Sequence, residues 1–298
     1  MPTVGRVGQR GKSEPGRRKR WTQLSLSRWV YKMEDGTTEG GKKGSHRKAA
    51  TALQPHTGEH PAVFKLEKEL QIHAGKYPVV YYGLHRLLRK DRTRIVTPDT
   101  QMVIEGFPRS GNSFARVAFN KAQKGKVRIA HGLHVPAQVI RAARWRIPTM
   151  VLIRKPKDAV LSFAIRDPIS VDQALRYYLS FYKTVETYRN AYVLGRFEEV
   201  TQDYGQLIER INQKFGTTFS LFRHDEENVN RIFARMEKRY RERYGETHWE
   251  TKVPRPSTTK EKMKQEVEYD LENPKTRRLF VEAEAVYHRL VNTQCSFP

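Results

Sequence analysis

The chain has 298 residues and a formal net charge of +24 at pH 7, from 56 Lys and Arg against 32 Asp and Glu. That length allows one large α/β domain or two small ones, and the charge predicts a polyanionic partner such as a nucleotide, a nucleic acid, an acidic polymer or an anionic membrane face. The single cysteine, Cys295, excludes an intramolecular disulfide, and because the sequence has no run of 18 apolar residues we expect no transmembrane helix.

The first 60 residues differ from the rest in composition. They hold 13 Lys and Arg against 5 Asp and Glu, with a basic cluster at 17–20, and they contain too little apolar surface to offset the entropy of ordering. We therefore expect a disordered tail at 1–60 and one α/β domain at 61–298. The basic cluster fits nucleic-acid binding, a targeting signal or a merely solvated tail. A secretory signal is missing, so the predicted location is the cytoplasm, with organellar targeting left open.

Apolar residues at helical spacing predict two short helices before the core, one marked by Val63, Leu66 and Leu70 and one by Leu84, Leu87 and Leu88. From residue 102 onward, strand patterns alternate with helix patterns. Strands are predicted at 102–104, 127–130, 149–153 and 192–197; helices are predicted at 112–121, from Pro136 with Val139, Ile140 and Ala143 on one face, from Pro156, and around Tyr177–Tyr182. The predicted fold is α/β, a three-layer P-loop-type core with a mostly parallel central sheet flanked by helices and a helical C-terminal third.

A glycine-rich segment joins the first strand to the first core helix. Its sequence from Gly106 to Ser113 has the spacing Gly-x-x-x-x-Gly-Asn-Ser, which is a Walker A frame with Asn112 in place of the lysine. Gly111 permits a tight curl of the backbone, and the following helix presents its positive N-terminus to an anion. The cation stands earlier, at Arg109, so the segment favours a 5′-phosphate with a small outer group over a triphosphate, although an ordinary Gly-Ser turn would have the same sequence.

A second basic motif follows the third predicted strand. Arg154 lies at the carboxyl end of that strand, in the crevice where α/β folds bind ligands, and Ser162 lies on the helix that follows. Either residue alone is compatible with a surface position.

Together the two motifs resemble the sulfotransferases that use 3′-phosphoadenosine 5′-phosphosulfate as donor. Pro-Arg-Ser-Gly-Asn-Ser at 108–113 is similar to the family's 5′-phosphosulfate loop, and Arg-Lys-Pro-Lys-Asp at 154–158, with Ser162, is similar to its 3′-phosphate motif. The resemblance spans about 103–216. It implies donor-binding roles for Arg109, Ser110, Gly111, Asn112, Ser113, Phe114, Arg154, Ser162 and Phe197, and it makes Arg255 and Lys260 candidates for a basic loop over the 3′-phosphate.

The resemblance also implies a histidine base and no required metal ion. His131 and His134 follow the second strand, and His134-Val135-Pro136 matches the family's His-x-Pro context, so we favour His134 as the base. Many family members carry a lysine two residues before this histidine, whereas this chain has Gly132. Arg109 is our candidate for the missing catalytic cation, and a lysine from elsewhere is the alternative.

Two other function classes remain open at the level of sequence. An ATP-dependent kinase of a small molecule fits the glycine-rich loop, but Asn112 and the lack of an obvious magnesium-binding aspartate disfavour it. A nucleic-acid-binding protein fits the net charge, and such binding would belong to the tail. The predicted function is sulfuryl transfer to the hydroxyl or amine of a small molecule or a glycan; the acceptor itself and the oligomeric state are not predicted.

Overall fold

A computed structural model describes residues 68–69, 71–88, 93–246, 249–255 and 257–292, which belong to one folded unit. The predicted tail at 1–60, the domain boundary at residue 61 and the apolar residues of the first predicted helix lie outside these residues. Within them, none of the helices combines the length and the hydropathy that a membrane span requires.

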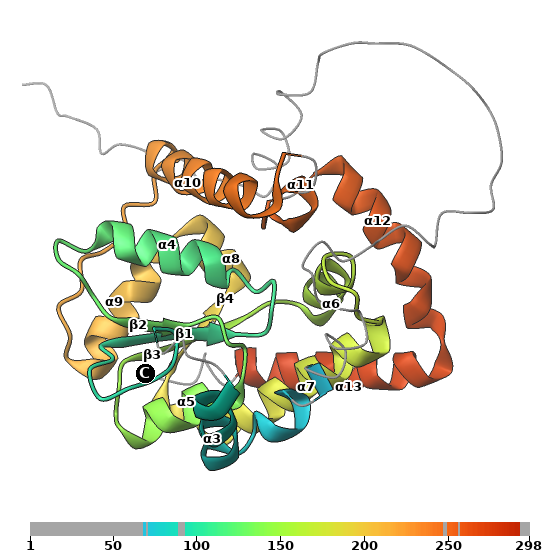
Figure 1. The fold of residues 1–298 in the computed structure, drawn as a ribbon, viewed down its shortest axis with the longest axis horizontal. Coiled ribbons are helices and arrows are strands. Elements are labelled where there is room, and N and C mark those ends of the chain that lie inside the picture. Colours follow the sequence, from blue (N-terminus) through green and yellow to red (C-terminus); the bar gives the residue numbers. More distant parts are fainter. Residues whose placement is uncertain (1–67, 70, 89–92, 247–248, 256, 293–298) are drawn as a thin grey trace, which may run out of the picture. The chain divides into compact units, whose positions relative to one another are not determined.

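The centre of this unit is a four-stranded sheet in which every strand pair is parallel. The strand order is β2-β1-β3-β4 (Figure 1), so the carboxyl ends of all four strands lie at the same edge. This arrangement confirms the predicted α/β class and the mostly parallel sheet. The strand bounds are Met102–Gly106 for β1, Ile129–His131 for β2, Thr149–Ile153 for β3 and Val193–Arg196 for β4.

The two central strands are buried along their whole length, because helices cover both faces of the sheet. Side chains alternate between the faces. Ile104 and Leu152 join one hydrophobic cluster, with side chains of the helices at 112–122 and 204–215. Val151 and Ile153 join a second, with side chains of the helices at 156–164, 171–186 and 274–292. The sheet is therefore the middle layer of three.

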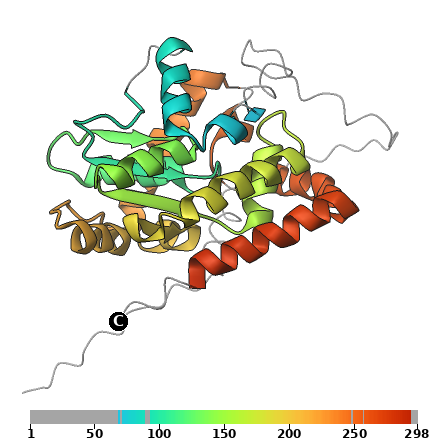
Figure 2. The same ribbon diagram turned by 90° about the horizontal axis from the view of Figure 1, so that it is seen from below.

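The helices divide between the faces in the same way. The first cluster is covered by α4 (Asn112–Ala122), α8 (Phe197–Gln202), α9 (Tyr204–Phe215) and α10 (Glu226–Tyr244). The other face carries α3 (Pro78–Leu88), α5 (Pro136–Arg144), α6 (Pro156–Ala164), α7 (Val171–Glu186) and α13 (Pro274–Asn292), and α13 lies along α7 (Figure 2). Short helices α11 (Trp249–Lys252) and α12 (Thr258–Glu268) and the 3₁₀ turns η1 (Arg189–Ala191) and η2 (Tyr269–Glu272) complete the described chain. The C-terminal third is helical, as predicted.

Several details of the prediction were wrong. The fourth strand, predicted at 192–197, ends at Arg196, because Phe197 opens a helix. The second strand begins at Ile129 rather than 127, since the Arg128 amide donates to the side chain of Gln101 instead of a neighbouring strand. Helix α3 turns Tyr82 and His85 inward and leaves Leu84 exposed. In α5, Ala142 is fully buried and Ala143 only partly, which shifts the inward face by one residue.

Candidate anion-binding site

The loop from β1 to α4 curls tightly through two left-handed residues. Arg109 has φ 69° and Gly111 has φ 90°. A side chain at Gly111 would be strained by this backbone conformation, and its Cβ would stand 3.3 Å from Val200 and 3.5 Å from Phe197. The predicted need for glycine at 111 therefore has two causes, the curl itself and the close approach of α8.

The N-terminus of α4 has no side-chain cap. Gly111 is the N-cap residue, and the first turn carries no acidic side chain. Asn112 does not cap the helix either: its Nδ2 donates to the Phe107 carbonyl at 2.9 Å, and its Oδ1 is buried without a partner among the described residues. Ser113 follows in the same turn, half-buried. The first amides of α4 are thus free to bind an external anion with the support of the helix dipole.

The structure brings Arg109 together with Arg154 and Ser162. The Nε of Arg109 donates to Ser162 Oγ at 2.8 Å, and Nη1 of Arg154 donates to the Arg109 carbonyl at 3.3 Å. The Arg154 guanidinium also lies 4.0 Å from the centre of the Phe197 ring. The two motifs, more than forty residues apart in the chain, meet because β1 and β3 are neighbours in the sheet.

Positive charge accumulates at this meeting point. Burial, followed by the nearby Arg166 and Arg154, lowers the pKa of the Arg109 guanidinium. Arg166 is paired with Asp167, but within the described part of the chain no carboxylate forms an ion pair with Arg109 or Arg154, and Arg154 Nε is buried without a partner. Both arginines are partly buried, and a cation that is partly desolvated without an ion pair is costly, so a bound anion would stabilise them.

Of the two candidates in the C-terminal basic segment, Lys260 lies beside Arg109, whereas Arg255 is turned toward α10. The Lys260 side chain is 4% exposed, and its Nζ donates to the carbonyls of Val253 and Arg255 at 2.7 Å each. Burial and then Arg109 lower the pKa of Lys260 to about 7, which places it beside the site. Arg255 instead pairs with Glu237 of α10 and lies 5.6 Å from the Phe233 ring. Sequence reasoning missed Lys252, whose carbonyl accepts from Arg109.

His134 stands beside the carboxyl end of β1 with a fixed tautomer. Its Nδ1 lies 2.7 Å from the Gly106 carbonyl. Because a carbonyl can only accept, Nδ1 carries the proton, and Nε2 keeps its lone pair. Burial, with further effects of Lys68, Arg166 and Arg94, lowers the pKa of His134 to about 3, although the Gly106 carbonyl opposes the shift. The imidazole is therefore neutral at pH 7 and can accept a proton only at Nε2.

His131, the other candidate base, has a different environment. It ends β2, and burial, Arg116 and Arg94 lower its pKa to about 3. Its backbone is held by Arg94, whose carbonyl accepts from the His131 amide at 3.1 Å. The described structure thus surrounds His131 with cations, whereas it holds the ring of His134 by a direct hydrogen bond.

A buried carboxylate, Glu105, supports the histidine loop and was not anticipated from the sequence. Its two oxygens accept from the amides of Leu133 at 3.0 Å and His134 at 2.9 Å. Burial outweighs these bonds and raises the pKa of Glu105 to about 7. The available signal was a lone glutamate in the apolar run of β1.

Three tyrosines of α7 each anchor one segment of the site. Tyr177 donates to the His134 carbonyl at 2.7 Å, and Tyr178 donates to the Arg154 carbonyl at 2.9 Å. Tyr182 donates to the Leu152 carbonyl and accepts from the Phe107 amide, with the buried Ser110 hydroxyl 3.4 Å away. Their rings are fully buried. The rings of this Tyr-rich helix thus belong to the core, and the hydroxyls hold the loops.

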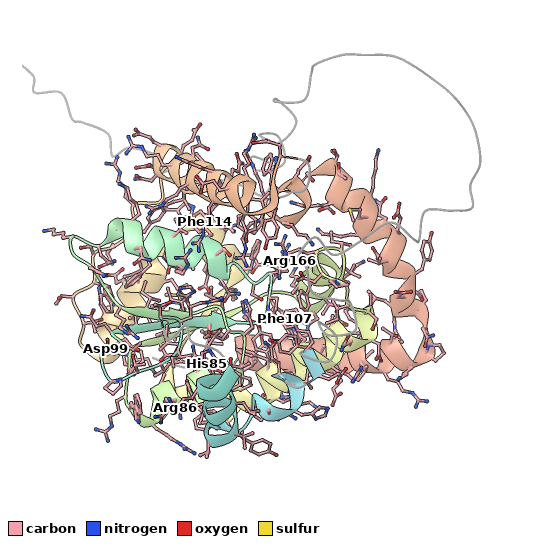
Figure 3. All side chains as sticks on the ribbon, in the orientation of Figure 1. His85, Arg86, Asp99, Phe107, Phe114 and Arg166 are labelled. Atoms are coloured by element: carbon pink, nitrogen blue, oxygen red, sulfur yellow. The ribbon has the colours of Figure 1, made fainter. Side chains whose placement is uncertain are left out.

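The two phenylalanines predicted at the donor differ in their surroundings. Phe114 is buried among aromatic side chains, including Tyr204, Phe222 and Phe233, on the α4 side of the sheet (Figure 3). Phe197 is partly exposed and faces Arg154. Of the two rings, Phe197 is therefore the one beside the cation cluster.

The part of the chain that the structure describes contains no group of three or more His, Cys, Asp or Glu side chains arranged to hold a metal ion. Comparisons with protein-family models, with curated proteins and with solved structures find no match to this chain. The resemblance to sulfotransferases accordingly stays a prediction from the two motifs.

Proposed function

We propose that this protein transfers a sulfuryl group from 3′-phosphoadenosine 5′-phosphosulfate to an acceptor hydroxyl or amine. The observation that carries the proposal is the junction of the two motifs, in which Arg109 contacts Ser162 and Arg154 contacts the Arg109 backbone. Two cations without carboxylate partners, beside an uncapped helix N-terminus, are the groups that a ligand with two separated anionic ends requires.

Different residues would hold the two anionic ends of this donor. The first amides of α4, with Ser110 and Ser113 and the Arg109 side chain, would hold the 5′-phosphosulfate. Arg154 and Ser162 would hold the 3′-phosphate, since Arg154 has a buried Nε with no partner in the described chain and the Ser162 hydroxyl lies beside the Arg109 guanidinium. Phe197 would offer an aromatic surface to the adenine. The family role of Phe114 has less support, because that ring is occupied by core contacts.

In the reaction, the bond between sulfur and the bridging phosphate oxygen breaks while a new bond forms between sulfur and the acceptor oxygen or nitrogen. His134 Nε2 takes the proton of the acceptor, and adenosine 3′,5′-bisphosphate leaves with the bonding electron pair. Arg109 stabilises the negative charge that develops on the leaving phosphate. A bound polyanion would offset Lys68, Arg166 and Arg94, and so would raise the pKa of His134 toward a value suited to a base.

The direct test is incubation of the full chain with donor labelled in the sulfuryl group and a panel of hydroxyl and amine acceptors, with EDTA present. We expect labelled product in the wild type and none with Arg154→Ala. A parallel incubation with ATP and Mg²⁺ tests the kinase alternative. Phosphoryl transfer from ATP, together with no binding of adenosine 3′,5′-bisphosphate in EDTA, would reject the proposal.

A further inference from the structure

Four arginines lie on three neighbouring segments near the β2 end of the sheet. Arg94 precedes β1 and contacts the histidine loop, Arg116 lies on α4, and Arg235 and Arg239 lie on α10, which packs against α4. We call this set the arginine rim. None of the four belongs to the donor-binding motifs, and only Arg94 enters the proposed chemistry, through its effect on the pKa of His134.

The contacts of Arg94 fix one side of the rim. Its Nη2 donates to the Gly132 carbonyl and its Nε to the His131 carbonyl at 3.4 Å. A Cβ at Gly132, which has φ 64°, would lie 2.8 Å from the Arg94 guanidinium. Neutral carbonyls thus hold the Arg94 side chain against the histidine loop. Glu105 attracts Arg94 electrostatically, but it is buried in the sheet and accepts hydrogen bonds from the loop amides.

Helices α4 and α10 supply the other side. Ile232 and Met236 turn inward and join the cluster that includes Phe114 and Val117 of α4. At 100° per residue, Arg239 lies about 20° around α10 from Ile232, so it stands at the margin of the α4 contact, with Arg235 one turn earlier. Arg235 and Arg239 are exposed, Arg116 is partly buried, and within the described residues their side chains form no ion pair or hydrogen bond.

The electrostatics agree with this placement. Burial, Arg239 and Arg94 lower the pKa of Arg116, which shows that the rim arginines repel one another. The same group acts on His131, where burial, Arg116 and Arg94 lower the pKa. Without a ligand the rim is a concentration of positive charge that an anion would relieve.

The strand order separates Arg94 and the histidine loop, at the β2 end, from Arg154. Arg154 follows β3, and β1 lies between β3 and β2. At roughly 4.8 Å between neighbouring strands, the β2 end lies about 10 Å from the β3 end. His134 stands between the two, beside the end of β1. A molecule that reacts at His134 would therefore extend toward the rim on the side away from the donor.

We propose that the arginine rim binds an anionic group of the acceptor, so that the acceptor carries a carboxylate, phosphate or sulfate in addition to the hydroxyl or amine that reacts. This inference rests on the proposed function and names the substrate class. An uncharged phenol, sterol or lipid alcohol would leave the four arginines unused.

The test uses the full chain saturated with adenosine 3′,5′-bisphosphate, which occupies the donor site, and titrates the compact polyanion sucrose octasulfate by calorimetry. We expect Arg235→Gln/Arg239→Gln to weaken octasulfate binding at least tenfold. The matched control is Arg277→Gln/Arg278→Gln on α13, which removes the same charge from another exposed surface and should weaken binding less than twofold. Thermal unfolding of both variants shows whether the fold is retained.

The outcomes separate the two proposals. Equal weakening in the two double variants, or no octasulfate binding by the wild type, overturns the rim whether or not the bisphosphate binds. No binding of adenosine 3′,5′-bisphosphate in the first titration rejects the proposed function, while octasulfate binding that depends on Arg235 and Arg239 would still support the rim as an anion site.

Discussion

The two ends of the sheet's carboxyl edge differ in the charged side chains that they hold and in the partners of those side chains. At the β1/β3 end, Arg109 and Arg154 are partly buried, form no ion pair within the described residues, and are bonded to a serine hydroxyl and a backbone carbonyl. At the β2 end, the histidine loop is built on a buried carboxylate, Glu105, which accepts from two of its amides. The first end thus holds cations that form no ion pair within the described residues, and the second holds its loop amides with a buried acid.

This difference indicates what each end is for. Cations that lack counter-ions are arranged to receive an anion from outside. A loop that is stabilised internally needs no ligand to hold its shape and can keep a histidine in one tautomer. We therefore assign donor binding to the β1/β3 end and proton acceptance to the histidine loop, and the predictions that follow are designed to test this division.

The largest expected effect is at His134. Because this residue has φ 58°, asparagine is the suitable replacement, since it tolerates the left-handed region. His134→Asn should lower the turnover number by about 10²- to 10⁴-fold and leave the affinity for adenosine 3′,5′-bisphosphate within about twofold of the wild type. His131→Asn is the matched variant, and steady-state kinetics compare the two. A greater loss of turnover in His131→Asn would move the base to that residue.

The next effect is at Arg154. Removing a buried cation from a charged contact costs about 2–5 kcal/mol, so Arg154→Ala should weaken bisphosphate binding roughly 30-fold to several thousand-fold. Arg196 ends the neighbouring strand β4 but is exposed and paired with Glu199. Arg196→Ala should therefore change affinity by less than about 1 kcal/mol. Calorimetric titration measures both, and similar losses would mean that position at the edge, rather than absence of a carboxylate, decides binding.

A smaller effect is expected at Glu105, on the free energy of unfolding. Its pKa rises on folding from its ordinary value of 4.5 to about 7, so the folded state binds the extra proton. The stabilisation is complete below pH 4.5 and is lost as the pH rises to 7. The free energy of unfolding of the wild type relative to Glu105→Gln should thus fall by about 3 kcal/mol across this range and stay level above it. Urea unfolding at several pH values measures this difference, and a relative stability that rises with pH would contradict the role given to burial.

The smallest effect is a change in protonation on binding. Lys260 has its pKa lowered to about 7 by burial and by Arg109, and a bound anion near Arg109 would raise it again. At pH 8, adenosine 3′,5′-bisphosphate should bind with uptake of less than one proton, and Lys260→Met should abolish that uptake. Calorimetry in buffers of different ionisation enthalpy detects it. Proton release by the wild type would mean that the anion does not approach Lys260.

The fold and the two motifs followed from the sequence because their signals are local. Continuous apolar runs marked the central strands, and Pro156 marked the start of α6. The placement of the two motifs at one edge of the sheet also followed, since strand–helix alternation brings successive loops there, whereas the direct contact of Arg109 with Ser162 was not predicted.

What the sequence could not give depends on contacts between distant residues. Glu105 has no neighbour in the sequence that signals its bonds to Leu133 and His134. The anchoring role of the α7 tyrosines depends on which carbonyls the fold brings within reach, and Arg255 was assigned to the donor from its place in the chain, whereas its side chain reaches Glu237. The arginine rim likewise draws on three separate segments.

The central claim is that the Gly106–Ser113 loop and the Arg154/Ser162 pair bind opposite ends of one bis-phosphorylated adenosine. The measurement that tests it most directly is the affinity of the wild type, Arg154→Ala and Arg109→Ala for adenosine 3′,5′-bisphosphate and for adenosine 5′-phosphate. The account predicts that Arg154→Ala weakens binding of the bisphosphate by at least thirtyfold, about 2 kcal/mol, with little change for the monophosphate, while Arg109→Ala weakens both. Equal losses for the two nucleotides in Arg154→Ala would contradict it.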